Sequence, residues 1–361
     1  MATSSRTWQR DWAVMPGEVL LEALEDRAMS QSDLARRMGR PIKTINEIVN
    51  GKASITPDTA IQLELTLGIA ADFWVNLESA YRAQLARVRS EEELSTYGAW
   101  ATAFPVKELA RHNLIEKESN PAGTVAALLR YFRVSSPDAW EMQWLAPAAA
   151  FRASPTYESQ PHAASAWLRW GELLADQIST TPFDANSLQG IIGEVRALSR
   201  QDLALSRQRL DDLFASVGVA LVLTPEFKGV RLSGAARWVA PDKALIQLSL
   251  RHKTDDQLWF SLFHEIRHLL QRKRIDFIDD EQASSQDADE LDADQFARDT
   301  LIPPDAYADL LGAGAITTQT IREFAKSQGI APGIVVGRLQ RDAHVSRLHF
   351  NDLKRPIRFG T

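Results

Sequence analysis

The sequence of 361 residues contains no cysteine. Disulfide bonds, thiolate metal sites and cysteine nucleophiles are therefore excluded, and any metal ion must be bound by histidine and carboxylate side chains. The chain also has no run of about 18 apolar residues that could cross a membrane, and its first residues lack the basic start and apolar stretch of a secretory signal. We therefore expect a cytoplasmic protein without a membrane partner.

The composition is that of an ordinary globular protein, with 45% hydrophobic and 24% charged residues. A chain of this length exceeds what one hydrophobic core usually organises, so more than one domain is expected. The formal net charge of −6 argues against a protein that coats nucleic acid indiscriminately. Residues 27–52, however, include six basic and two acidic side chains, so this segment is locally positive.

Hydrophobic periodicity predicts a mostly α protein with a small β-sheet, an α+β fold. Apolar positions follow helical spacing from residue 17 to about 87, and a mostly helical pattern resumes after the polar stretch 88–97. Short, partly β-branched runs then predict strands of a small antiparallel sheet at 217–224, 235–239 and 244–250. We predict an all-α N-terminal domain, a helical middle region and a C-terminal domain, at 1–90, 91–215 and 216–361.

A possible metal site lies in a helix expected from about 255 to 271, which contains His264-Glu265-Ile266-Arg267-His268. Two histidines four residues apart lie about 40° apart around a helix axis, so both can bind one ion. In zinc metalloproteases with this spacing the histidines bind Zn²⁺ and the glutamate acts as a base toward a metal-bound water. The flanking residues are apolar, so these polar groups are costly to bury without a function. The alternative is that they are satisfied core side chains.

A zinc site needs a third protein ligand, and the candidates are the carboxylates of residues 289–297, which open a second amphipathic helix. On a helical wheel Asp292 projects within about 40° of Phe296, the side expected to face the core. Glu290 points away from that side. We therefore predict His264, His268 and Asp292 as the ligands, with Glu290 as the alternative third ligand.

These motifs resemble those of the ImmA/IrrE-like metallopeptidases, in which a His-Glu-x-x-His helix is followed by Glu-x-Glu-Ala-Asn/Asp-x-Phe-Ala and Leu-x-Pro. The corresponding residues here are Glu290-Leu-Asp292-Ala-Asp294-Gln-Phe296-Ala and Leu301-Ile-Pro303. The resemblance covers about residues 215–345 and implies a zincin-like zinc peptidase domain whose third ligand comes from the second helix. Two positions depart from the family: Asp292 replaces the usual glutamate, and Arg267 often has a small residue as its counterpart.

Residues 17 to about 82 resemble HigA-like antitoxin regulators of the Xre type, on the segments 30–39, 43–48, 50–52, 55–57, 67–69 and 72–77. The resemblance implies a helix-turn-helix, which places its second helix in the major groove of DNA. The second helix is expected at 42–49, anchored by Ile42, Ile45, Ile48 and Val49.

The exposed side of that helix includes Lys43, Thr44 and Asn46, which we predict to face base edges. Gln31, Arg40 and Lys52 are predicted to contact phosphates, which position a domain without reading sequence. The alternative is a solvated charged face on a helical bundle that binds another protein.

Together these features predict an antitoxin-like transcriptional regulator that binds a double-stranded DNA operator as a homodimer. Its zinc-dependent endopeptidase domain would cleave a regulatory protein or the chain itself, with Glu265 as the catalytic base, and a cognate toxin is a possible partner. In the alternative, the peptidase-fold domain is a non-catalytic sensing or dimerisation module. Two further expectations are a partner surface formed in part by Trp140, Trp144, Trp167 and Trp170, and a solvated acidic loop at 276–281.

Overall fold

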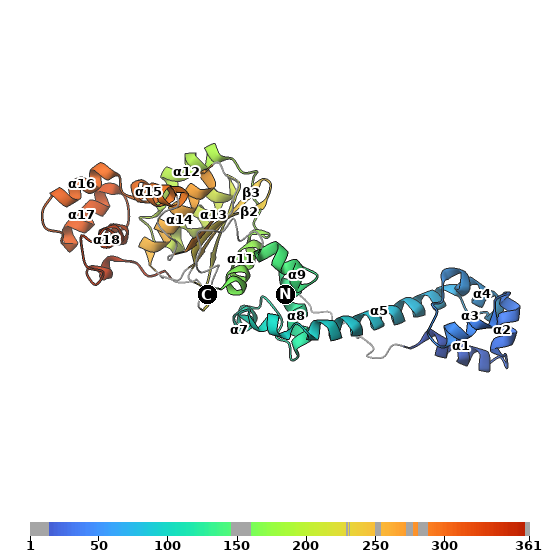
Figure 1. Ribbon diagram of the computed structural model, residues 1–361. Helices are drawn as coiled ribbons and strands as arrows, with labels where there is room; N and C mark the ends of the chain where they lie inside the picture. The colour runs from blue at the N-terminus through green and yellow to red at the C-terminus, as the bar shows by residue number, and fades with distance from the viewer. Residues whose placement is uncertain are drawn as a thin grey trace. The chain divides into compact units, whose positions relative to one another are not determined.

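The computed structural model describes residues 14–145, 160–228, 230, 232–249, 254–271 and 288–357, together with the backbone of 277–280 (Figure 1). The chain divides into two compact units. One contains residues 1–97 and 120–123, and the other contains 98–119 and 124–361. Within the described ranges no helix is long and apolar enough to span a membrane.

Between residues 14 and 97 the first unit consists of five helices, α1 (Pro16–Glu25), α2 (Gln31–Met38), α3 (Ile42–Val49), α4 (Pro57–Leu67) and α5 (Ala71–Ser95). Local signals define their ends. The Ser30 hydroxyl accepts a hydrogen bond from the Asp33 backbone N–H at 3.1 Å, which caps α2. Gly39 ends α2 with φ +64°, a conformation that favours glycine. The polar stretch 88–97 is largely the last part of α5, not a separate linker.

The core of the first unit is formed by side chains from all five helices, including Leu20, Leu34, Ile45, Leu63 and Trp74, which are fully buried. Helices α1 and α3 approach closely at Gly17, where a Cβ atom would lie 2.1 Å from the Val49 carbonyl oxygen. A residue without a side chain is therefore required at this contact.

The sheet of the second unit has the order β1-β3-β2-β4 and is mixed. Its strands are β1 (Val219–Thr224), β2 (Leu232–Ala240), β3 (Lys243–Ser249) and β4 (Phe277–Asp280). β1 pairs with β3 in parallel, whereas β2 is antiparallel to both β3 and β4. The prediction of an antiparallel sheet is therefore wrong in part. β3 lies between β1 and β2 and runs parallel to β1. The predicted acidic loop is also wrong for 277–280, whose backbone forms a strand.

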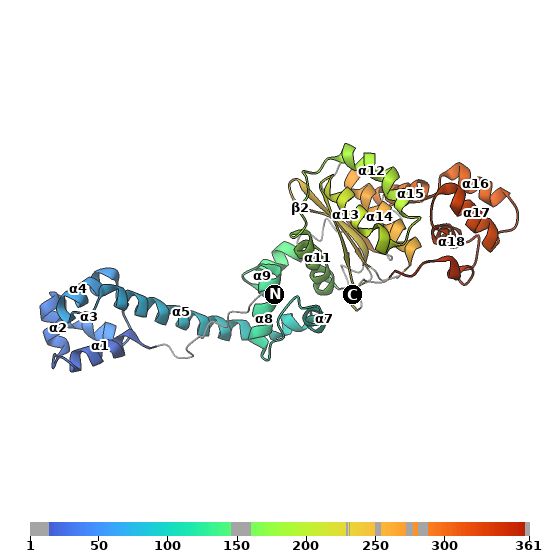
Figure 2. The same ribbon diagram turned by 180° about the vertical axis from the view of Figure 1, so that it is seen from behind.

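Helices cover both faces of this sheet. Alternate residues of β1 face opposite sides: Ala220 and Val222 pack with α11 (Pro161–Ala175), whereas Val219 and Leu221 join the larger core. The larger core is shared with α12 (Ala185–Leu198), α13 (Leu203–Ala215) and α14 (Asp255–Leu270). The view from behind in Figure 2 shows the same helices and sheet. The helices α11 to α13, predicted to lie in a middle region, thus pack in one unit with the sheet.

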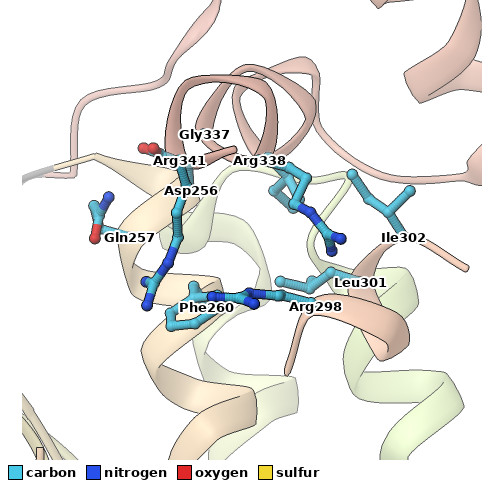
Figure 3. A pocket seen from close by; sticks show the side chains of 10 residues that line it. Asp256, Gln257, Phe260, Arg298, Leu301, Ile302, Gly337, Arg338 and Arg341 are labelled. Carbon is cyan, nitrogen blue, oxygen red and sulfur yellow. The ribbon is translucent and has the colours of Figure 1, made fainter. Parts of the chain in front are cut away.

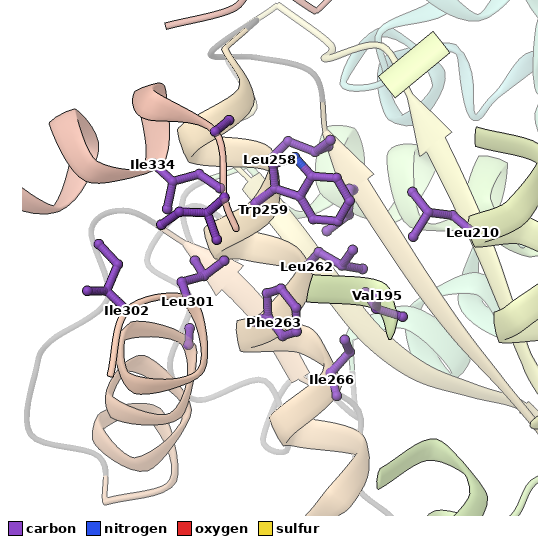
Figure 4. Close-up of a cluster of buried hydrophobic side chains, with 14 of the residues drawn as sticks. Val195, Leu210, Leu258, Trp259, Leu262, Phe263, Ile266, Leu301, Ile302 and Ile334 are labelled. Carbon is purple, nitrogen blue, oxygen red and sulfur yellow. The ribbon is translucent and has the colours of Figure 1, made fainter. Parts of the chain in front are cut away.

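Helix α14 lies at the centre of the larger core (Figure 4). Its Trp259, Leu262 and Phe263 are almost fully buried, and Figure 4 shows them among Val195 of α12 and Leu301 at the end of α15. Further helices complete the unit: α6 (Gly98–Thr102), α7 (Val106–Arg111), α8 (Pro121–Phe132), α9 (Pro137–Trp140), η1 (Glu141–Leu145), α15 (Ala288–Leu301), α16 (Pro304–Gly312), α17 (Thr318–Gln328), α18 (Pro332–Arg341) and η3 (Asn351–Leu353).

The four tryptophans considered for a partner surface are buried, with exposed fractions of 0% for Trp140, 3% for Trp144, 1% for Trp167 and 9% for Trp170. They are core residues, so that expectation is wrong. The fold class is confirmed, because the described residues are mostly helical and include a small sheet.

Candidate metal centre and nucleic-acid interface

Helices α14 and α15 pack against each other and bring three ionisable side chains together. His264 and His268 lie one turn apart on α14 and are 2% and 1% exposed. On α15 the buried stripe consists of Ala293, Ala297 and Leu301, and its small alanines allow the two helices to approach. Glu290 precedes Ala293 by three residues, so it lies on the same stripe and faces the histidines.

The ligand atoms of these three residues converge. The Nε2 atoms of His264 and His268 are 2.9 Å apart, and Glu290 oxygens lie 3.1 Å from the first and 3.5 Å from the second. Ligands on a tetrahedral Zn²⁺ at about 2.0–2.1 Å stand roughly 3.3 Å from one another. The three side chains are therefore a group that could hold a metal ion, all ligand atoms lying within 4.8 Å.

The outer nitrogens of both histidines have acceptors. His264 Nδ1 lies 3.2 Å from Asp294 Oδ1, and His268 Nδ1 lies 3.0 Å from Gln271 Oε1. When a metal is bound, an acceptor at Nδ1 favours the tautomer with its proton there and directs the Nε2 lone pair toward the ion. This pattern is typical of histidines that bind metals.

The electrostatics also suit a cation. Burial by itself raises the pKa of Glu290, but hydrogen bonds from His264 and His268 outweigh this effect and lower the pKa to about 2. Glu290 is therefore ionised at neutral pH, in the form that binds a metal.

Asp292, the third ligand predicted from the sequence, lies elsewhere. Arg267 donates to both of its oxygens, from Nε at 2.7 Å and Nη2 at 3.1 Å, and the hydrogen bond from Arg267 lowers the pKa of Asp292. The prediction of Asp292 took Phe296 to lie on the core side of α15. Phe296 is only partly buried, with the Arg267 guanidinium 5.4 Å from its ring centre. In the structure Glu290, the alternative third ligand, lies beside the histidines, and Asp292 does not.

Glu265, the predicted catalytic base, is fully buried beside the sheet. A Cβ atom at Gly234 of β2 would lie 2.3 Å from Glu265 Oε1, so this carboxylate occupies the space that a larger residue would fill. The structure places Glu265 on the same helix as the two histidines, and its catalytic role stays a prediction.

The predicted DNA-contact residues lie on or beside α2 and α3 of the first unit. Lys43, Asn46 and Lys52 are exposed, whereas Gln31, Arg40 and Thr44 are half-buried. The Lys43 side chain is 83% exposed, and its Nζ atom lies 3.8 Å from Glu47 Oε1 in an ion pair along α3.

Two more of these side chains have hydrogen-bond partners within the unit. Asn46 Oδ1 accepts a hydrogen bond from Asn50 Nδ2 at 3.1 Å, and Arg40 Nε donates to Gln62 Oε1 at 2.5 Å. The prediction that Ile42 anchors α3 is wrong, because Ile42 is 54% exposed. It is the first residue of the helix, one turn before the first buried position, Ile45.

Residues 20–74 match the family model described as "Helix-turn-helix". The uncharacterized HTH-type transcriptional regulator YddM of Escherichia coli (strain K12) is 33% identical over 66 residues, which are 18% of this chain and 70% of that protein. The chain belongs to the helix-turn-helix family.

Two further similarities concern the same domain. Antitoxin HigA-1 of Vibrio cholerae serotype O1 is 35% identical over 81 residues, 22% of this chain and 76% of that protein. A solved addiction module antidote protein of the HigA family from Coxiella burnetii is 35% identical and covers 23% of this chain and 92% of its own, with a TM-score of 0.22. The metal-centre residues lie outside the matched helix-turn-helix segment, so their function rests on their geometry.

Proposed function

We propose that the protein is an antitoxin-like transcriptional regulator that binds operator DNA and carries a zinc-dependent endopeptidase centre. The DNA-binding part is supported by its relatives, one named a transcriptional regulator and one an antitoxin. It is also supported by α3, which buries Ile45, Ile48 and Val49 and leaves Lys43 and Asn46 exposed.

In this proposal α3 enters the major groove, where Lys43, Thr44 and Asn46 face base edges. Gln31, Arg40 and Lys52 contact the phosphates on either side. Because the exposed part of one α3 is short, two copies on adjacent half-sites give the operator its length, so we expect a homodimer on the DNA.

The peptidase part is carried by one observation, the convergence of His264, His268 and Glu290 with Glu265 on the same helix. Two imidazoles and one carboxylate suit Zn²⁺ and leave a fourth position open. When bound, the ion supplies a Lewis acid that polarises a carbonyl and lowers the pKa of a coordinated water.

The protein's own groups would then orient the histidines and move a proton. Asp294 and Gln271 hold the Nδ1 sides of His264 and His268. Glu265 would accept a proton and pass it to the leaving amine. The substrate would be a regulatory protein, a cognate toxin or the chain itself, so that cleavage changes repression.

A second candidate function is favoured by the burial of Glu265. A general base must reach water and substrate, and this carboxylate is 0% exposed. The same domain would then act as a non-catalytic sensing or dimerisation module that binds a metal without turnover.

The replacement Glu265→Gln separates the two candidates, with Glu323→Gln on the exposed side of α17 as the matched control. We expect Glu265→Gln to retain zinc and DNA binding but to abolish a cleavage product, seen on a gel together with promoter output before and after stress. Identical derepression in wild type and Glu265→Gln, with no truncated protein in either, would leave the non-catalytic function.

A further inference from the structure

A pocket of the second unit lies between α14, the end of α15 and α18 (Figure 3). The space between these elements amounts to about 410 Å³ when the part open to solvent is included. Phe260, Leu301, Ile302 and Ile334 supply apolar walls. These walls point to a ligand with an apolar part.

The remaining lining is unusually rich in arginine. Figure 3 shows Arg298, Arg338 and Arg341 around the same space, and the Arg341 guanidinium lies 4.4 Å from the Phe260 ring centre. Arg298 Nε and Arg338 Nη1 are buried, and neither has a hydrogen-bond partner within the described part of the chain. A buried donor without an acceptor costs free energy, which an added acceptor would recover.

The charges around the pocket do not cancel. Arg338 Nε donates to Asp342 at 2.5 Å, and Lys354 Nζ lies 2.7 Å from Asp256. Arg298 and Arg341 share one carboxylate, Asp294, at 3.3 and 2.8 Å. Four basic side chains therefore face three acidic ones, which leaves one positive charge for a ligand to neutralise.

We propose that this pocket binds a small carboxylate that carries a short apolar group, and that its binding is coupled to the candidate metal centre through Asp294. The carboxylate would contact the arginines in the charge-assisted geometry that guanidinium groups favour. The apolar group would lie against Phe260 and the aliphatic side chains. The proposed pocket does not depend on the metal, whereas the coupling rests on the proposed metal centre.

The coupling follows from the two oxygens of Asp294. Oδ2 receives Arg298 and Arg341, while Oδ1 lies 3.2 Å from His264 Nδ1. A ligand that takes over these arginines withdraws them from Asp294, which becomes a stronger acceptor for the His264 N–H. Replacing an acceptor that holds the outer nitrogen of a metal-binding histidine changes metal affinity by about 10–100-fold. Because linkage is reciprocal, the metal must change the affinity for the ligand by the same factor.

A carboxylate next to a short apolar group occurs in two kinds of ligand, a free organic acid and the C-terminal residue of a peptide. Benzoate serves as the free acid, and a tetrapeptide of three alanines and a C-terminal phenylalanine serves as the second source. Benzamide and the amidated peptide are their uncharged counterparts. Inorganic phosphate is an anion without an apolar part.

The test is calorimetric titration of the full chain after removal of metal with a chelator. We expect benzoate to bind at least about tenfold more tightly than benzamide or phosphate. Binding of the free-acid peptide but not of its amide assigns the pocket to a peptide C-terminus, and benzoate binding alone assigns it to a free acid. Equal affinities for benzoate and benzamide would overturn the proposal, and this comparison needs no variant.

Variants locate the site. We expect Arg341→Gln to weaken benzoate binding by about tenfold or more, and Arg322→Gln, at an exposed position of α17, to leave it unchanged. Thermal unfolding of both variants controls for folding. Unchanged benzoate affinity in a folded Arg341→Gln protein would place the binding elsewhere and overturn the proposal.

Zinc titrations with and without saturating benzoate test the coupling. We expect saturating benzoate to change the zinc affinity at least several-fold, and bound zinc to change the benzoate affinity by the same factor. The Asp294→Asn protein should still bind benzoate but show neither change. Identical zinc affinities with and without benzoate would overturn the coupling. A wild-type protein that binds no zinc would instead overturn the proposed metal centre, and the comparison of benzoate with benzamide would still decide the pocket.

Discussion

Glu290 and Asp292 lie two residues apart on α15, and replacing each by its amide tests which of them binds the metal. Glu290→Gln and Asp292→Asn remove the same charge and preserve side-chain shape. Glu290 oxygens lie 3.1 and 3.5 Å from the Nε2 atoms of the histidines. Asp292 is linked to His268 through Gln271, whose Nε2 donates to Asp292 at 3.0 Å and whose Oε1 lies 3.0 Å from His268 Nδ1.

The two replacements should therefore reduce the zinc affinity by different factors. Loss of an outer contact such as Asp292 weakens metal binding by about 10-fold, whereas loss of a direct ligand weakens it by more than about 100-fold. The larger factor corresponds to about 2.7 kcal/mol of binding free energy.

The assay is a competition titration of zinc against a chromophoric chelator, with metal content measured on the purified proteins. Circular dichroism confirms that both variants are folded. A folded Asp292→Asn protein that loses zinc as completely as Glu290→Gln, or a Glu290→Gln protein with wild-type zinc affinity, would contradict the assignment of Glu290 as the ligand.

Three further predictions concern other parts of the protein. Lys43→Ala and Asn46→Ala should weaken binding to a duplex selected from a random pool far more than to random DNA, measured by gel shift; equal losses would assign both residues to backbone contacts. Gly17→Ala should destabilise the helix-turn-helix domain by about 1–3 kcal/mol in thermal unfolding, because its Cβ would lie 2.1 Å from the Val49 carbonyl oxygen; an unchanged melting temperature would contradict the close contact. Burial, with repulsion from Asp256, raises the pKa of Asp255 to about 6 although backbone hydrogen bonds oppose this shift. The folded protein therefore retains a proton that the unfolded chain loses above pH 4, so the free energy of unfolding should fall by up to about 3 kcal/mol between pH 4 and 6, and Asp255→Asn should remove this fall in denaturant titrations.

Local signals in the sequence determined the helices that carry the functional side chains. Ser30 and Gly39 define α2 by capping and by a left-handed conformation, and α3 was predicted with the bounds 42–49 that the structure shows. The spacing of His264 and His268 likewise places both on one side of α14 whatever surrounds the helix. These features depend on neighbours within a few residues, so the sequence was sufficient for them.

The arrangement of those helices depended on contacts between distant residues. Which carboxylate meets the histidines is decided by the rotation of α15 about its axis, and packing of Ala293 and Ala297 against α14 selects Glu290 over Asp292. The backbone of 277–280 became a strand because β2 offered it a hydrogen-bonding partner. Periodicity records which side of an element is apolar, but the identity of the facing element is set by the packing of the whole core, and only the tertiary structure contains it.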